Sequence, residues 1–310
     1  MSDVEIIEAM RLSDLTLFAS PTGVLSIIAH YSRPNVYSFR LGAGIEVTAY
    51  HLQSEEHIIY NRPIPDEISN ICHIIGTVGD IIYFQGMKRG MDYILFTFDI
   101  STHVSTYKGR IDGTLSPSVS PTGQIYLCGG FDGAFHKLDL ITMVKTELPD
   151  MIVPRIDCKS FFHNGSIYTI GGLDTSYGDI ADCERFDIER NKWYTIASLP
   201  VPSRVMTLVE KDGSLIAVTM KKQVFVYDPE KDEWQILKWD KDFTKLELGT
   251  LQYYRGKFYA VSEEDRENPT AVVWESSSPE TPWNTILKLK KHFRSKVNAY
   301  LNLTEEQVPL

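Results

Sequence analysis

The stretch that decides the fold is residues 154–200, PRIDCKSFFHNGSIYTIGGLDTSYGDIADCERFDIERNKWYTIASLP. It contains an apolar segment that ends at Asn164-Gly165, a second apolar segment that ends at Gly171-Gly172, a polar loop, and two further apolar segments separated by polar residues. Asn-Gly is a strong signal for a tight hairpin turn because glycine accepts positive φ. Short segments rich in β-branched and aromatic residues, alternating with turn residues, predict a four-stranded antiparallel meander.

The same order of elements recurs along the chain. A glycine followed by an apolar run marks the turn into the second segment of each copy, and the intervals between these glycines are 56, 44, 42, 48 and 43 residues. Each copy then ends with an aromatic residue or a leucine, usually an acid, and a polar turn, most clearly from Phe186 to Trp193 and from Tyr227 to Trp234. The glycines of the six copies are Gly23, Gly79, Gly123, Gly165, Gly213 and Gly256.

A sheet of this kind has two apolar faces and is not stable alone, so we expect the six copies to pack radially as blades. The sequence therefore predicts an all-β fold, a β-propeller of six blades with four antiparallel strands each. The longest interval leaves room for an inserted hairpin at about residues 34–44 in the first blade. The predicted organisation is an N-terminal extension at 1–13, blades at 14–65, 66–109, 110–149, 150–200, 201–240 and 241–289, and a C-terminal tail at 290–310.

Composition and charge exclude several classes of protein. The net charge is −10, so the chain lacks the basic footprint of a nucleic-acid-binding protein. It has no apolar stretch of the ~20 residues that a membrane span needs. The N-terminus is acidic where a signal peptide would be basic, and the four cysteines are scattered. We therefore expect a cytoplasmic protein with reduced cysteines, with the nucleus as the alternative location.

The repeated motifs resemble those of the kelch-repeat family. The family's double glycine after the second strand is present at Gly129-Gly130 and Gly171-Gly172, and its separated aromatic pair matches Tyr177 and Trp193. The resemblance implies a β-propeller that acts as a protein-interaction platform, an adaptor or scaffold for a protein or peptide. Many relatives are substrate receptors of ubiquitin ligases and carry a BTB or F-box segment before the repeats. Thirteen residues precede the first blade, so we expect neither segment, and a ubiquitin-ligase component or substrate is an expected partner.

The loops between second and third strands share one face with the connections between blades, and in kelch-repeat proteins this face commonly holds partner peptides. Arg155 and Arg204 occupy matching positions in adjacent repeats, and with neighbouring basic residues they predict a basic patch for an acidic or phosphorylated peptide. The alternative is that these arginines bond loop carbonyls and that Tyr177 packs in the core, whereas Phe131 is a candidate exposed anchor. The partner-binding candidates are Lys88, Arg89, Phe131, Asp132, Arg155, Tyr177 and Arg204, with Lys221 and Lys222 as further members of the basic patch.

Catalytic motifs are missing from the sequence. It contains no GxSxG, HExxH, Walker A or GxGxxG string, and it lacks the Glu-x3-Asp-x3-His iron motif of the kelch propellers that act on glucosinolate breakdown products. We therefore predict no catalytic residue, no metal ligand and no cofactor, in a chain that is not an enzyme. The alternative is an enzyme of the sugar isomerase or lyase type with its site in the central channel of the propeller.

Overall fold

In the computed structural model, the regular elements of the described residues are all β-strands. Within each sheet, every strand pairs in antiparallel fashion with the next one along the chain, so the predicted all-β class of meanders is confirmed. Among the described residues there is no helix with the length and apolar character to cross a membrane. The structure describes residues 13–15, 24–30, 34–41, 45–51, 57–62, 68–78, 81–88, 93–99, 104–113, 115–238, 251–254, 256–264 and 270–290.

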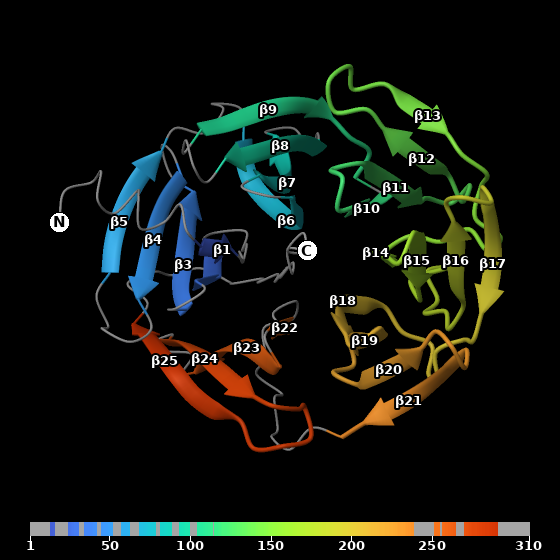
Figure 1. The fold of residues 1–310 in the computed structure, drawn as a ribbon. Coiled ribbons are helices and arrows are strands. Elements are labelled where there is room, and N and C mark those ends of the chain that lie inside the picture. Colours follow the sequence, from blue (N-terminus) through green and yellow to red (C-terminus); the bar gives the residue numbers. More distant parts are fainter. Residues whose placement is uncertain are drawn as a thin grey trace, which may run out of the picture. The chain divides into compact units, whose positions relative to one another are not determined.

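The described strands form six sheets, which belong to two compact units. The first unit holds one five-stranded sheet and two four-stranded sheets (Figure 1). Its strands are β1 (Ser13–Leu15), β2 (Val24–His30), β3 (Pro34–Leu41), β4 (Ile45–His51) and β5 (His57–Arg62); β6 (Ile68–Val78), β7 (Ile81–Lys88), β8 (Tyr93–Asp99) and β9 (Val104–Arg110); and β22 (Gln252–Tyr254), β23 (Lys257–Glu264), β24 (Thr270–Ser276) and β25 (Asn284–Lys290).

The first sheet has one strand more than the sequence predicted. Its order is β1-β2-β3-β4-β5, and β3 pairs with β2 on one side and with β4 on the other. The extra residues of the longest interval therefore add a fifth strand to the meander. The prediction of four strands is wrong for this sheet and confirmed for the other five.

The second unit holds three four-stranded sheets, which supply the candidate site. Their first strands lie next to one another, β10 beside β14 and β14 beside β18 (Figure 1). The strands are β10 (Leu115–Val119), β11 (Ile125–Gly129), β12 (Phe135–Leu138) and β13 (Lys145–Glu147); β14 (Lys159–His163), β15 (Ser166–Ile170), β16 (Cys183–Asp187) and β17 (Lys192–Ile196); and β18 (Val205–Lys211), β19 (Ser214–Thr219), β20 (Val224–Asp228) and β21 (Glu233–Leu237).

The predicted hairpin turns are present between the first and second strands of these sheets. Asn164 and Gly165 have φ of 44° and 72°, and Asp212 and Gly213 have φ of 50° and 82°. Two successive residues with positive φ match the right-handed twist of the flanking strands, which explains the Asn-Gly and Asp-Gly pairs. These turns set the register of β14 with β15 and of β18 with β19.

Aromatic side chains join neighbouring sheets of the second unit. Phe135 of β12 lies 4.7 Å from Phe186 and 5.0 Å from Trp193, measured between ring centroids, and both partners belong to the next sheet. The Trp193 indole also donates a 2.7 Å hydrogen bond to the carbonyl of Pro149, and Trp234 donates an equivalent bond to Ala197. The tryptophan of the fourth strand thus fixes the connection that precedes its own sheet.

Replacing Trp193 by phenylalanine is expected to lower the free energy of unfolding by about 2 kcal/mol, because the variant loses a hydrogen bond and leaves a void in a packed core. Trp234→Phe is the matched comparison, since its indole makes the same bond from a half-buried position. We expect it to cost about 1 kcal/mol in urea unfolding. Equal losses for the two variants would mean that the inter-sheet packing of Trp193 contributes nothing.

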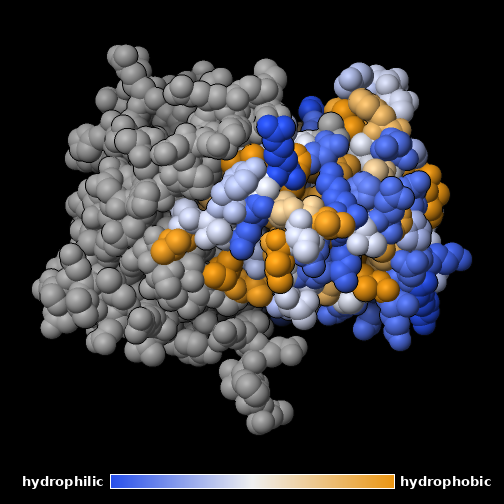
Figure 2. All heavy atoms as spheres, turned by 90° about the horizontal axis from the view of Figure 1, so that it is seen from above, coloured by the Kyte–Doolittle hydropathy of each residue, from blue (hydrophilic) through white to orange (hydrophobic). Residues whose placement is uncertain are grey.

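The surface of the described residues mixes polar and apolar side chains. Figure 2 shows hydrophilic residues over most of the coloured part of the molecule, with hydrophobic residues between them. Apolar atoms form more than half of an ordinary protein surface, so single exposed apolar residues need no functional explanation. An exposed pair that is held in a fixed geometry is more informative, and the second unit contains one.

Candidate functional site

Five segments of the second unit meet at one edge of its sheets, and we call this edge the loop face. Strands alternate in direction, so the loops after the second strands and the connections between sheets lie at the same edge. Backbone hydrogen bonds join them: Met151 donates to the carbonyl of Gly133 at 2.9 Å, and Gly172 donates to that of Ser203 at 3.2 Å. The segments are the loops 130–134, 171–182 and 220–223 and the connections 148–158 and 197–204.

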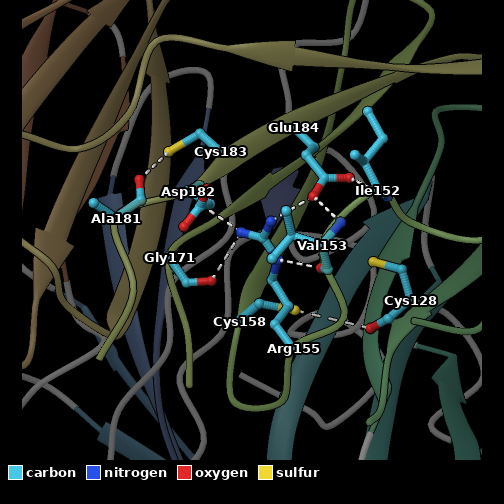
Figure 3. Close-up of polar contacts among 10 residues, drawn as sticks. All are labelled: Cys128, Ile152, Val153, Arg155, Cys158, Gly171, Ala181, Asp182, Cys183 and Glu184. Carbon is cyan, nitrogen blue, oxygen red and sulfur yellow. Dashed lines mark hydrogen bonds and ion pairs between the residues drawn. The ribbon is translucent and has the colours of Figure 1, made fainter. Parts of the chain in front are cut away.

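Arg155 of the first connection is fully buried beneath the loop face (Figure 3). Its Nη2 lies 2.5 Å from Oε1 of Glu184, and its Nε donates to the carbonyl of Val153 at 3.0 Å. Its Nη1 donates to the carbonyls of Gly171, at 3.3 Å, and of Asp182. All three guanidinium nitrogens therefore have partners, as a buried charge requires.

Glu184 of β16 completes this buried ion pair and is itself almost fully buried. Besides Arg155, its Oε2 accepts a hydrogen bond from the backbone of Ile152 and its Oε1 accepts one from Val153, both at 2.8 Å. The carboxylate thus holds the connection 148–158 against the next sheet (Figure 3).

The sequence placed Arg155 among the surface residues that contact a partner, and the structure corrects this. The alternative interpretation, in which the arginine bonds loop carbonyls, is the one that the structure shows. The predicted equivalence with Arg204 holds for the backbone, because Arg155 bridges to Gly130 and Arg204 bridges to Gly171. The side chains differ, since that of Arg204 is 38% exposed.

Arg204 and Lys221 are paired with carboxylates on the loop face. Arg204 lies 3.5 Å from Asp157 through Nη1 and 3.5 Å from Asp179 through Nε. Lys221 Nζ lies 3.0 Å from the other oxygen of Asp179 and donates to the carbonyl of Pro202 at 2.7 Å. Of the described members of the predicted basic patch, Arg155 is buried, Arg204 and Lys221 are paired with carboxylates, and Lys222 lies half-buried in the loop 220–223.

Phe131 and Tyr177 form an exposed aromatic pair on the loop face. Their side chains are 45% and 68% exposed, and their ring centroids lie 5.7 Å apart at an interplanar angle of 77°. This is the edge-to-face arrangement that aromatic quadrupoles favour. The expectation that Tyr177 packs in the core is wrong, and the expectation that Phe131 is exposed is confirmed.

Asp174 fixes the shape of the loop that presents Tyr177. Its Oδ1 accepts hydrogen bonds from the hydroxyl of Ser176 at 2.7 Å, from the Ser176 amide at 2.8 Å and from the Gly178 amide at 2.9 Å. The Ser176 hydroxyl first, and then the two amides, lower the pKa of the Asp174 carboxyl from its usual value. The carboxylate is therefore ionised at neutral pH beside the exposed tyrosine.

The remaining predicted residues divide between the two units. Asp132 is exposed next to Phe131, and its Oδ1 accepts a 3.2 Å hydrogen bond from the Ala134 amide. Lys88 is the last residue of β7 in the first unit, and Arg89 lies outside the described residues. The loop face of the second unit thus brings together Phe131, Asp132, Tyr177 and Arg204.

Sequence comparisons relate this chain to proteins with kelch repeats. The family model for the kelch motif matches residues 154–200. A kelch repeat protein C2 of cowpox virus is 24% identical over 223 residues, which cover 68% of this chain and 39% of that protein. A protein named as an F-box/kelch-repeat protein in Arabidopsis thaliana is 32% identical over 183 residues, 56% of this chain and 46% of that protein. This chain therefore carries a kelch motif and is similar in sequence to kelch-repeat proteins.

A solved structure has a similar fold over nearly the whole length of this chain. It is a chain of a crystal structure of a nidogen/laminin complex, with a TM-score of 0.61 at 10% sequence identity. The similarity covers 95% of this chain and 99% of that chain. Six antiparallel meanders and this propeller-like neighbour give the fold class, a kelch-type β-propeller.

This chain spans less than half the length of the curated relatives named above. The same is true of the kelch repeat and BTB domain-containing protein 8 of Rattus norvegicus, which is 27% identical over 135 residues, 23% of its length. The names of these relatives include F-box and BTB segments, and the matches to them cover only part of each protein.

The sequence analysis missed two residues that shape the loop face, Glu184 and Asp179. Glu184 lies two residues before Phe186 in β16, and this spacing alone places both side chains on one face of the strand. A charged residue on an apolar face is a signal that the sequence contained. Asp179, which pairs with both Arg204 and Lys221, carried no comparable signal, because an aspartate in a polar loop is ordinary.

The described cysteines are free and buried, as the sequence predicted. Burial raises the pKa of the Cys183 thiol to about 12. The pKa of Cys128 is also raised, first by its hydrogen bond with the Cys158 thiol and then by burial. Protonated, buried thiols are poor nucleophiles, so Cys128 and Cys183 have a structural role in their strands.

Proposed function

We propose that this chain is a protein-interaction platform, an adaptor or scaffold that holds a peptide or protein on the loop face of its second unit. Kelch-repeat relatives are generally protein-interaction modules. The observation that carries the proposal is the exposed pair of Phe131 and Tyr177. Large aromatic side chains supply most of the binding energy at many protein interfaces.

The loops that present this pair are held in fixed positions, which supports the proposal. Tyr177 donates its amide to the carbonyl of Asp174 at 3.0 Å, and Gly133 donates to that of Gly130 at 3.2 Å. A binding surface that is ordered before binding loses little conformational entropy when the partner arrives. Functional residues on loops positioned by a rigid scaffold are also common among binding proteins.

We expect the Phe131→Ala/Tyr177→Ala variant to lose about ten-fold or more in affinity for partners that the wild-type chain captures, because each truncated anchor costs about 1 kcal/mol or more. The measurement is quantitative capture from a lysate of cells that express the chain, after both proteins are shown to unfold at the same temperature. Ile141→Ala/Val144→Ala is the matched control. Both residues are exposed apolar side chains of the same unit, and they lie at the opposite edge of the sheets, between β12 and β13.

Loss of the same partners from both variants would show non-specific adhesion and would contradict the proposal. Retention of every partner by the aromatic variant would remove the loop face as the binding surface. For the partner itself, the F-box and BTB names of two relatives support a ubiquitin-ligase component or a ligase substrate. We propose the cytoplasm or the nucleus as the place of this interaction, and a role without catalysis.

A further inference from the structure

The edge-to-face geometry of Phe131 and Tyr177 has a consequence for what they bind. The two rings meet edge to face, at an interplanar angle of 77°. In this arrangement each ring keeps at least one face that the other ring does not cover. An aromatic face carries partial negative charge and attracts a cation within about 6 Å of the ring centroid. The chain already uses this contact elsewhere, since Arg185 and Lys192 lie 5.4 and 5.3 Å from the ring centroid of Tyr194.

The charges beside the pair are negative. Asp132 follows Phe131 directly and is exposed, and Asp174 lies in the same tight turn as Tyr177. Asp174 stays ionised because three hydrogen bonds stabilise its carboxylate. Each aromatic ring therefore has a carboxylate in its own loop.

Three of the four described basic residues that the sequence placed in the patch have carboxylate partners, and the fourth, Lys222, is half-buried. Arg204 pairs with Asp157 and Asp179, and Lys221 pairs with Asp179. Arg155 lies in the interior with Glu184. An acidic segment that approached the aromatic pair would meet Asp132 and Asp174 first, and it would have to displace carboxylates from Arg204 and Lys221 to gain a cation.

We propose that the occupant of the aromatic pair is the side chain of an arginine or lysine in a partner segment. The cation would stack on the open ring face, with the carboxylates of Asp132 and Asp174 beside it. This inference rests on the proposed function and names the chemistry of its partner. It reverses the acidic or phosphorylated partner that the sequence predicted, because Arg155 is buried and Arg204 and Lys221 are paired with carboxylates.

The test uses the full chain and a synthetic peptide array whose central position is Arg, Lys, Gln, Glu or phosphoserine, with randomised flanking residues. The wild type is expected to enrich Arg and Lys peptides, and affinities are then measured on the best members and on their Gln counterparts. Phe131→Leu/Tyr177→Leu keeps apolar side chains and removes the aromatic faces. We expect this variant to bind Arg peptides about five-fold more weakly and Gln counterparts unchanged.

A second pair of variants isolates the charge. Asp132→Asn keeps an oxygen that accepts the Ala134 amide and removes the negative charge. We expect about two-fold weaker binding of Arg peptides at low salt, with the difference vanishing at high salt. Asp139→Asn is the matched control: its carboxylate caps the β12–β13 turn at the opposite edge of the sheets, and we expect it to bind like the wild type.

The outcomes separate this inference from the proposed function. Enrichment of Glu or phosphoserine peptides that is lost in Phe131→Ala/Tyr177→Ala would overturn the cationic occupant and leave the loop face as the binding surface. Arg peptides that bind the leucine variant as well as the wild type would also overturn it. Binding of any peptide class that is unaffected by the alanine variant would overturn both proposals. An array with no binder would overturn the inference, while lysate capture would still decide the proposed function.

Discussion

Replacing Arg155 by methionine is expected to lower the free energy of unfolding by about 3–5 kcal/mol. Removal of the guanidinium leaves the buried carboxylate of Glu184 without its charged partner. It also removes the donor to the carbonyls of Val153, Gly171 and Asp182, of which the bond to Gly171 is buried and the other two are partly buried. A buried charge or acceptor without a partner costs far more than the pair itself contributes.

The measurement is urea unfolding of the variant followed by circular dichroism, with Arg190→Met as the matched control. Arg190 also makes a 2.7 Å ion pair, with Asp187, but its side chain is 67% exposed. A surface pair of this kind is worth at most about 1 kcal/mol, so the control is expected to unfold almost like the wild type. A loss below about 1 kcal/mol for Arg155→Met would contradict the role of the ion pair that the structure shows.

The buried ion pair also shows how far sequence reasoning reaches. The position of Arg155 in its repeat was predictable, because Pro154-Arg155 and Pro202-Ser203-Arg204 stand at matching places at the start of their repeats. Its burial was not, because that depends on a carboxylate 29 residues further along the chain and on carbonyls at the two ends of the loop 171–182. Repeat patterns are local, whereas the pairing of a charge is decided by tertiary contacts.

The strands and turns were predictable because the residues that determine them are close together in the sequence. The described turns at Gly123, Gly165, Gly213 and Gly256 carry their own signal, a glycine with positive φ, and most strands of the second unit carry apolar residues that are buried. The fifth strand of the first sheet, β3, was the exception. A segment such as Pro34–Leu41 has strand composition whether it forms an inserted hairpin or one additional strand, and only its pairing distinguishes the two.

The candidate site was predictable in its location and not in its electrostatics. The loops between second and third strands were expected to carry the binding residues, and Phe131 and Tyr177 do lie there. Their ring contact joins loops of two different repeats, and the pairing of Arg204 and Lys221 with Asp179 ties two more segments to the loop of Tyr177. A count of basic residues in the loops therefore predicts a positive surface. In the structure, Arg204 and Lys221 are instead paired with a carboxylate.

Replacing Gly171 by alanine is expected to be among the most destabilising changes in the chain, with a loss of about 3 kcal/mol or more. The residue has φ of 56°, which costs any other amino acid about 1 kcal/mol or more. An added Cβ would also lie 2.1 Å from the carbonyl oxygen of Ser203 and 3.2 Å from Leu199. The first of these neighbours is backbone, so a side-chain rotation does not relieve the clash.

Gly165→Ala separates the two costs. Gly165 has φ of 72°, and a Cβ built on it meets no atom within 4 Å. In this control only the unfavourable backbone conformation of alanine destabilises the fold. We therefore expect the free energy of unfolding to fall by about 1 kcal/mol in the same urea titration. The difference between the two variants measures the close approach of the second strand to the connection 197–204, which positions Arg204 on the loop face. Similar losses at Gly165 and Gly171 would mean that this approach relaxes freely and that the double glycine serves only its backbone conformation.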